Sequence, residues 1–236
     1  MGMSGLKIKE LSIGLFQSET DRDRQRKVGA SQISDPCTRH LAMAIMGEKQ
    51  GPSKYWLGGK IGTAVHGLLE DSIEKSRGVP EFADAVVEQK ITLGELPEYG
   101  VISSKPDLVL PAQKHLVDWK TSTRAKTKKI QKWIDGESTD SRTNYTMQKY
   151  IGQTQLYAWG CAQGGTEIET ISLVFINRDG TNEVDVVEYT YEYDEQIALA
   201  LWNRLVALWD ELKEGTHPQS YSGNADCFNC SMNGLS

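Results

Sequence analysis

Long apolar runs are absent from this sequence. No part of its 236 residues approaches the roughly eighteen uninterrupted apolar residues that a membrane-spanning helix needs. The segment 1–16 has neither a long apolar core nor a small-residue cleavage site, which argues against a secretory signal peptide. Leu6 stands where an N-myristoylation signal requires Ser or Thr. We therefore expect a cytoplasmic protein that makes no use of a membrane.

Positive charge is not in excess either. The formal net charge is −6, which argues against a general nucleic-acid coat, because such a surface needs clustered cations that displace counterions. It does not exclude a nuclease, since carboxylates that hold metal ions add to the negative total. One local basic cluster remains, which we interpret as a solvated loop that also contacts substrate; it consists of Arg124, Lys126, Lys128, Lys129 and Lys132.

The remaining composition indicates one folded domain. Hydrophobic residues make up 39% of the chain, enough for a substantial core. We expect a polar N-terminal arm over 1–30 and a single domain over 31–236 that includes a cysteine-bearing tail. The predicted helices cover 34–47, 60–75, 146–162 and 194–213. The predicted strands cover 84–93, 99–110, 114–120, 168–177 and 183–192, the first three forming a meander, and 123–144 is expected to be a long loop with at most a short helix at 130–134.

The triplet Asp118-Trp119-Lys120 is the feature that points most directly to chemistry. On a strand, side chains two residues apart share a face, so Asp118 and Lys120 project together while Trp119 packs the other way. Asp107 lies on the preceding strand, where Pro106 predicts a bulge or bend. Two converging carboxylates would bind a divalent cation, and the lysine would orient a water or stabilise charge on phosphorus. Such a triplet also occurs at solvated strand ends, so its meaning depends on the rest of the chain.

Two helices offer further polar side chains. Gly62, His66 and Glu70 are spaced four apart and share one helix face, where the glycine permits close approach. His66 is either a hydrogen-bonded structural residue or a metal ligand beside the two acids, and Glu70 is either an outer-shell partner or a surface acid. On a later helix Gln153 and Tyr157 are also four apart, a spacing that suits hydrogen bonding and stacking on a nucleic-acid strand.

In this order the motifs resemble those of the RecB-like branch of the PD-(D/E)xK nucleases, in particular CRISPR-associated and bacteriophage exonucleases. The resemblance runs from about residue 31 to residue 230. It implies a restriction-endonuclease-like α/β core, with a central mixed β-sheet flanked by helices. The matching motifs are Gly62-x-x-x-His66, Pro106-Asp107, Asp118-x-Lys120 and Gln153-x-x-x-Tyr157.

The resemblance also implies residue roles. His66, Asp107, Asp118 and the backbone carbonyl of Trp119 would coordinate one or two Mg²⁺ or Mn²⁺ ions, and Lys120 would be the catalytic lysine. The helix motif Gln153 and Tyr157, together with Arg124 and Lys126 of the basic cluster, would contact DNA. The chain departs from the family pattern at Ser104, where the second motif often has glycine.

The four cysteines are Cys37, Cys161, Cys227 and Cys230. Cys227 and Cys230 form a C-x-x-C pair, a pattern that indicates half of a metal site. Iron–sulfur members of the family use one cysteine before the histidine motif and three near the C-terminus, and this chain supplies three of those four. His40 completes the set, because it lies three residues from Cys37 on a helix, whereas Cys161 is better explained as a buried thiol. Three cysteines and a histidine favour structural Zn²⁺ that joins the N- and C-terminal segments, with an iron–sulfur cluster or no metal as alternatives.

The sequence thus predicts a metal-dependent deoxyribonuclease, with DNA as its substrate. We expect an exonuclease encoded by a phage, active in the cytoplasm of the bacterial host in DNA recombination, repair or degradation, with a recombination protein as a possible partner. A structure-specific endonuclease and a non-catalytic DNA-binding recombination partner are the alternatives, and the oligomeric state stays open.

Overall fold

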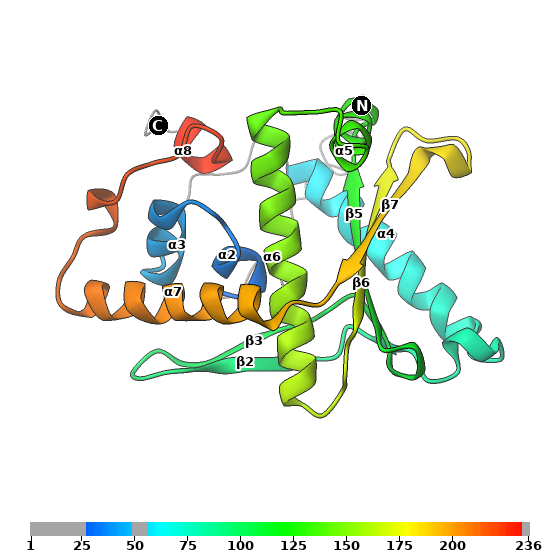
Figure 1. Cartoon of the computed structure of the whole chain (residues 1–236), viewed down its shortest axis with the longest axis horizontal. Helices are drawn as coiled ribbons and strands as arrows, with labels where there is room; N and C mark the ends of the chain where they lie inside the picture. The colour runs from blue at the N-terminus through cyan, green and yellow to red at the C-terminus, as the bar shows by residue number, and fades with distance from the viewer. Residues whose placement is uncertain (1–26, 49–55, 233–236) are drawn as a thin grey trace, which may run out of the picture.

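The computed structural model describes residues 27–48 and 56–232 (Figure 1). Within them the helices are α2 (Ala30–Ile33), α3 (Thr38–Ile45), α4 (Trp56–Lys75), α5 (Arg124–Ile134), α6 (Ser141–Gln163), α7 (Glu195–Lys213) and α8 (Phe228–Met232). The strands are β1 (Val86–Val87), β2 (Ile91–Leu96), β3 (Gly100–Ser104), β4 (Leu108–Leu110), β5 (His115–Ser122), β6 (Thr170–Asn177) and β7 (Val186–Glu192). Among the described helices, none combines the length and apolar composition of a membrane span.

The central sheet is mixed, as predicted. Its strand order is β1-β4-β5-β6-β7, and a separate two-stranded sheet is formed by β2 and β3. Strand β5 pairs antiparallel with β4 and parallel with β6, with Asp118 opposite Leu173. The parallel pair requires a crossover, which α5 and α6 provide. The triplet therefore lies on the central strand of the sheet, between an antiparallel and a parallel neighbouring strand.

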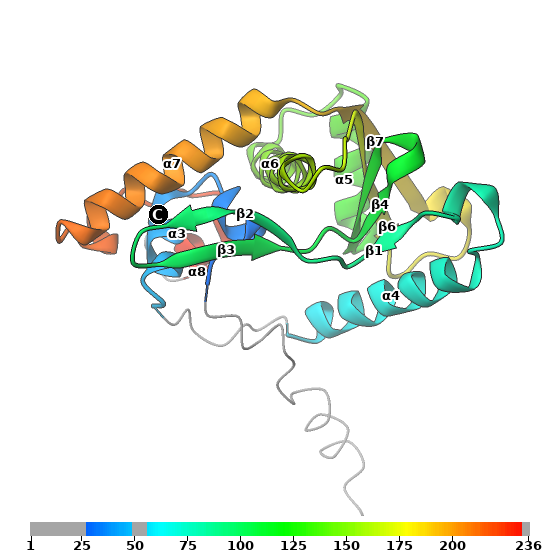
Figure 2. The ribbon, with the colours of Figure 1, turned by 90° about the horizontal axis from the view of Figure 1, so that it is seen from below.

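Helices cover both faces of this sheet (Figures 1 and 2). On one face Trp119 of β5 and Leu108 of β4 are buried with Ile73 of α4. On the other face Phe175 of β6 packs with Met147 of α6 and with apolar residues of α5. Alternate residues of β5 and β6 thus pack against helices on opposite faces of the sheet, as the two-residue period of a strand requires.

A third apolar cluster surrounds the C-terminal half of α6. It is built from α2, α3, α6, α7, the β2–β3 hairpin and residues of β4, β5 and β6, and Leu41, Leu156 and Leu205 are fully buried in it. Val28 and Ala30 also lie in this cluster. Of the predicted N-terminal arm, residues 1–26 lie outside the described part of the chain.

The predicted three-stranded meander is wrong in its details. The segments expected as strands 84–93 and 99–110 each split in two, so that β1 pairs with β4 in the central sheet and β2 pairs with β3 outside it. The split has local causes on both segments. Glu88 adopts a left-handed backbone (φ 47°), and Pro106 has no N–H to donate to a ladder. The expected bend at Pro106 is therefore present, and it separates β3 from Asp107.

The expected long loop over 123–144 is also wrong, because most of it is helical. Helix α5 begins after Thr123, whose side chain accepts a hydrogen bond from the backbone N–H of Lys126 (3.4 Å). Ile130 of this helix is fully buried against the sheet. The basic cluster therefore lies on one helix. The first predicted helix starts later than expected, at Thr38, because the side chain of Asp35 accepts from the N–H of Cys37 instead of capping a helix at 36.

Candidate active site

The predicted catalytic residues line one pocket with a volume of about 620 Å³. They arrive from three parts of the fold: α4, the β4–β5 region of the sheet and α6. The structure brings together His66, Asp107, Asp118, Lys120, Gln153 and Tyr157. The ordered motifs therefore lie together in the structure, and the role of each residue stays a prediction.

Asp107 is fixed at both of its carboxylate oxygens. Oδ1 lies 3.2 Å from Nδ1 of His66, and Oδ2 accepts a hydrogen bond from the backbone N–H of Trp119 (2.8 Å). His66 reaches this position because α4 passes close to β5 at Gly62, where a Cβ atom would come within 3.1 Å of the Thr121 hydroxyl. The bend at residue 106 and the glycine in α4 thus explain how a helix and two strands meet at one carboxylate.

Trp119 separates the two functional faces of β5. Its buried ring lies on the α4 side, 6.2 Å from the His66 ring in an edge-to-face arrangement of 86°. Along a strand, the N–H and C=O of one residue point to the same neighbouring strand. Because the N–H of Trp119 points at Asp107, its carbonyl is directed to the same side, beyond the end of β4.

Asp118 and Lys120 form a buried pair in which Oδ2 and Nζ are 2.6 Å apart. Burial raises the pKa of Asp118 to about 6 against the effect of the Lys120 ammonium, and the charge of Asp107 adds to the increase. Burial acts against the charged form of Lys120, but the carboxylates of Asp118 and Asp107 outweigh it and raise the lysine pKa. The pKa of the acid is therefore raised mainly by burial, and that of the lysine by the two carboxylates beside it.

Lys120 is positioned by the helix motif. Its Nζ donates to Oε1 of Gln153 (3.3 Å), and Nε2 of Gln153 donates to the hydroxyl of Tyr157 (2.6 Å). Gln153 and Tyr157 are buried on one face of α6, as their spacing predicts. Their direct contact is with each other and with the lysine, so they hold the ammonium in place at the pocket floor.

Glu88 is a site residue that the sequence did not reveal. Its carboxylate, His66 and Asp107 each offer one ligand atom, and these atoms lie within 4.8 Å of one another. The backbone N–H of Glu88 donates to the carbonyl of Asp107 (3.3 Å), so the two residues are coupled through the main chain as well. No local sequence signal marks Glu88, because the β1–β4 pairing brings it to the pocket. Glu70 is half-buried and is not part of this group.

The residues present fit a divalent cation. Nδ1 of His66 and Oδ2 of Asp118 are buried atoms without a hydrogen bond of good geometry among the described residues, although charged neighbours lie close to both. Burying such atoms is costly unless a partner satisfies them. Carboxylate oxygens with one imidazole form the donor set that suits Mg²⁺ or Mn²⁺.

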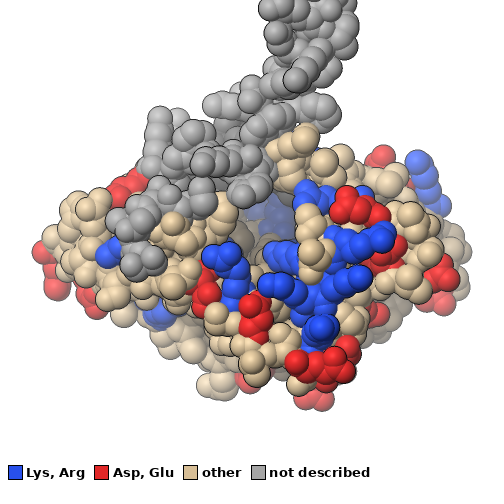
Figure 3. Space-filling view, turned by 90° about the horizontal axis from the view of Figure 1, so that it is seen from above, with Lys and Arg blue, Asp and Glu red and all other residues tan. Residues whose placement is uncertain are grey.

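The basic cluster lies on α5, outside this pocket. Seen from the α5 end of the molecule, Lys and Arg side chains gather beside a hollow (Figure 3). The two residues of this cluster that are predicted to contact DNA point in different directions. Arg124 donates to the carbonyl of Asp179 (2.9 Å), whereas Lys126 donates to the hydroxyl of Tyr150 (3.2 Å), which lies under Lys120.

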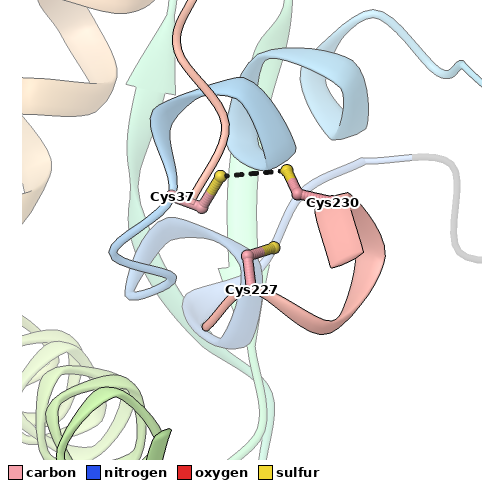
Figure 4. A group of neighbouring side chains, drawn as sticks. All are labelled: Cys37, Cys227 and Cys230. Carbon is pink, nitrogen blue, oxygen red and sulfur yellow. Dashed lines mark hydrogen bonds between the residues drawn. The ribbon is translucent and has the colours of Figure 1, made fainter. Parts of the chain in front are cut away.

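Three of the four cysteines meet at a second site (Figure 4). The sulfurs of Cys37, Cys227 and Cys230 lie within 4.8 Å of one another, and those of Cys37 and Cys230 are 3.5 Å apart. This site joins the start of α3 to α8, 193 residues later in the chain. Cys161 is a buried free thiol that belongs to the apolar cluster around α6, as expected.

His40 reaches the cysteine site from α3. It forms a group with Cys227 and Asp35 in which the ligand atoms lie within 4.8 Å, and its Nδ1 is 2.9 Å from Oδ2 of Asp35. Hydrogen bonding to Cys37 and His40 outweighs burial and lowers the pKa of the Cys227 thiol. Asp35 also accepts a hydrogen bond from Lys149 (2.7 Å). A carboxylate that orients a ligating histidine is a common feature of zinc sites.

Comparisons with known proteins agree with this geometry. The family model of the PD-(D/E)XK nuclease superfamily matches residues 38–235. A search of curated proteins finds no significant match. The fold is similar to that of an alkaline exonuclease from Laribacter hongkongensis, with a TM-score of 0.51 and 14% identity over 82% of this chain and 91% of that one. It is also similar to that of a candidate exonuclease from Eubacterium rectale, with a TM-score of 0.53 and 13% identity over 98% and 94%. The chain therefore belongs to the PD-(D/E)XK nuclease superfamily.

Proposed function

We propose that this nuclease is a Mg²⁺- or Mn²⁺-dependent deoxyribonuclease that acts as an exonuclease. The observation that carries the proposal is the meeting of two carboxylates, an imidazole and a glutamine-held lysine in one pocket. The solved structures similar in fold are described as exonucleases, which supports the same assignment. A phage origin, a role in DNA recombination or repair, and a recombination partner protein are parts of the proposal that rest on the sequence resemblance.

The pocket residues have different roles in the proposed hydrolysis. His66, Asp107, Asp118 and the carbonyl of Trp119 would hold one or two cations, and Glu88 is placed to join them. The bound cation would supply Lewis-acid polarisation of the phosphodiester and a more acidic water. The ammonium of Lys120 would orient the attacking water or stabilise negative charge on phosphorus, and Gln153 keeps it aimed at that position.

Hydrolysis of labelled DNA by purified variants tests the proposal. With Mg²⁺ present, Asp118→Ala and Lys120→Ala are expected to lower the rate by at least about 10²-fold, because each removes a group that acts on the transition state. Lys114→Ala is the matched control, since Lys114 is an exposed lysine paired with Glu167 and Glu169 away from the pocket. Parental rates in the two site variants would disprove the assignment. Calorimetry that detects no Mg²⁺ binding at the pocket would instead favour the non-catalytic DNA-binding alternative.

An exonuclease requires a free DNA end, whereas an endonuclease does not. An obligate exonuclease leaves covalently closed circular single-stranded DNA intact but degrades the same molecule after linearisation. We expect this result. Cutting of the closed circle at a rate similar to that of the linear form would establish the structure-specific endonuclease instead.

We also infer a structural Zn²⁺ site at the cysteines. The ligands would be Cys37, Cys227, Cys230 and His40, with Asp35 orienting the histidine. In a tetrahedral site Zn–S bonds of about 2.3 Å hold two sulfurs about 3.8 Å apart, close to the 3.5 Å between Cys37 and Cys230. Metal analysis of the purified protein is expected to give zinc and a colourless solution. A brown protein that contains iron would establish the iron–sulfur alternative, and a metal-free protein would exclude both.

A further inference from the structure

A groove separate from the catalytic pocket runs between α5, the N-terminal half of α6 and α8. Its volume is about 610 Å³. Its lining combines basic side chains with three aromatic ones: Lys126, Lys129, Arg142, Lys149, Tyr145, Tyr150 and Phe228. Helix α5 carries five Lys or Arg and no Asp or Glu, and two of these cations, Lys126 and Lys129, line the groove. Positive charge is therefore concentrated at this groove, where Figure 3 shows Lys and Arg side chains beside a hollow.

The carboxylates in the groove wall already have partners. Asp35 is buried and is bound to His40 and Lys149. Asp140 caps α6 by accepting from the backbone N–H of Thr143 (3.0 Å), and it lies 3.7 Å from Lys129. Asp226 accepts from Ser141 (3.1 Å). The groove lining thus holds four Lys or Arg against three Asp, and the cationic groups that face an anionic ligand most directly are Lys126, Lys129 and Arg142.

The groove and the catalytic pocket share no lining residue, but they are neighbours. Tyr150 lies between the two, with Nζ of Lys120 5.0 Å and Nζ of Lys126 5.3 Å from its ring centroid. Lys120 lines the catalytic pocket and Lys126 lines the groove. A strand whose scissile phosphate lies at Lys120 can therefore continue along the groove without leaving the basic surface.

The far end of the groove is formed by Phe228, the first residue of α8, whose side chain is 49% exposed. A half-exposed aromatic ring at the end of a basic channel suits the face of an unpaired base. A duplex keeps its base faces stacked inside, so it offers no equivalent contact. Phe228 follows Cys227 directly, so the cysteine site fixes the backbone that presents this ring.

We propose that the α5–α6–α8 groove binds a single-stranded segment of the DNA substrate, on the assumption that the proposed nuclease activity is correct. Lys126, Lys129 and Arg142 contact successive phosphates, and Phe228 stacks on a base several nucleotides from the scissile bond. The groove thereby gives this nuclease a preference for substrates with an unpaired strand, which the catalytic pocket alone does not specify.

Binding of labelled oligo(dT) to the full-length protein, measured without divalent cations so that nothing is cleaved, tests the groove. Lys129→Glu is expected to weaken binding about tenfold and to lower the salt dependence by about one phosphate contact. Lys128→Glu is the matched control. It makes the same charge change on the same helix, but Lys128 faces the β6–β7 connection. Equal weakening by both variants would overturn the proposal, because it would mean that only overall charge matters.

The aromatic contact has its own test. Phe228→Ala is expected to weaken oligo(dT) binding at least fivefold without changing its salt dependence, and Phe228→Trp is expected to restore it. Blunt duplex binding should be unaffected by Phe228→Ala. Unchanged oligo(dT) binding, or an equal loss for duplex, would refute base stacking. These binding assays are independent of hydrolysis, so a protein that binds as expected but fails to cleave would contradict the proposed function and leave the groove assignment standing.

Discussion

Replacing Lys120 by Met should destabilise the protein in a strongly pH-dependent way when no divalent cation is present. Methionine keeps the apolar stem but removes the only ammonium paired with the buried carboxylate of Asp118. The folded-state pKa of Asp118 is about 6, above its ordinary value. A raised acid pKa means that stability is lost as pH rises from the ordinary value of the acid to its folded-state value, and losing Lys120 extends this range upward because it raises the folded-state pKa further.

The size of the effect follows from linkage. Below pH 6 the carboxyl is protonated in both proteins, so the charge contributes no difference between them. Above pH 6 the variant loses about 1.36 kcal/mol per pH unit relative to the parent, until its own higher pKa is reached. Between pH 6 and pH 8 this amounts to at most about 2.7 kcal/mol, or about 5–11 °C in melting temperature for a domain of this size.

Thermal unfolding followed by circular dichroism at pH 5.5 and pH 8 measures the effect. Lys114→Met, at an exposed lysine, is the control and should change little at either pH. Adding Asp118→Asn to Lys120→Met should recover most of the loss at pH 8, because it removes the unbalanced charge. Millimolar Mg²⁺ should do the same by replacing the ammonium with a cation. An equal loss at both pH values, insensitive to Mg²⁺, would mean that Lys120 acts through packing and would refute the charge argument.

Three further outcomes are expected. Glu88→Gln should weaken Mg²⁺ binding measured by calorimetry, whereas Glu98→Gln, which also has a left-handed backbone but lies exposed outside the pocket, should leave it unchanged. Gly94→Ala should lower the free energy of unfolding in urea by about 1–3 kcal/mol, because the new Cβ would clash with the indole of Trp202. Gly59→Ala, where the Cβ would enter open space on α4, should instead raise the free energy of unfolding by about 0.5–1 kcal/mol. Removing the proposed Zn²⁺ with a strong chelator should lower both the melting temperature and the oligo(dT) affinity, since the cysteine site anchors α8.

The parts of the site that were predictable from sequence are those set by local periodicity. Asp118 and Lys120 share a face because they are two apart on a strand, and Gln153 and Tyr157 share one because they are four apart on a helix. The meeting of these pairs at 3.3 Å between Lys120 and Gln153 depends on tertiary structure, but the ordered motifs of a known family supplied that information. The same motifs allowed the mixed sheet to be expected before any pairing was known.

The errors arose where local composition and tertiary structure disagree. The sequence predicts a loop over 123–144 because the segment is polar and contains Gly136, Ser138 and Thr139, and the few apolar positions that pack on the sheet, such as Ile130, form no long pattern. The hairpin segments were read as continuous strands because the switch between two sheets depends on which strand each half meets, and that pairing is not local. Glu88 was missed for the same reason, since its place beside Asp107 depends on the β1–β4 pairing.

The two ends of the domain combine both kinds of information. The C-x-x-C pair indicated a metal site from local spacing, but the position of α8 beside the α5–α6 groove depends on Cys37, which lies 193 residues before Cys230. A helix of five residues is too short to be stable alone. Its position must come from tertiary contacts. Among its residues whose side chains the structure describes, Cys230 is buried, and the buried Cys227 directly precedes the helix. A structural metal at the cysteines would therefore do more than stabilise the domain, because the same backbone that it holds presents Phe228 to the groove.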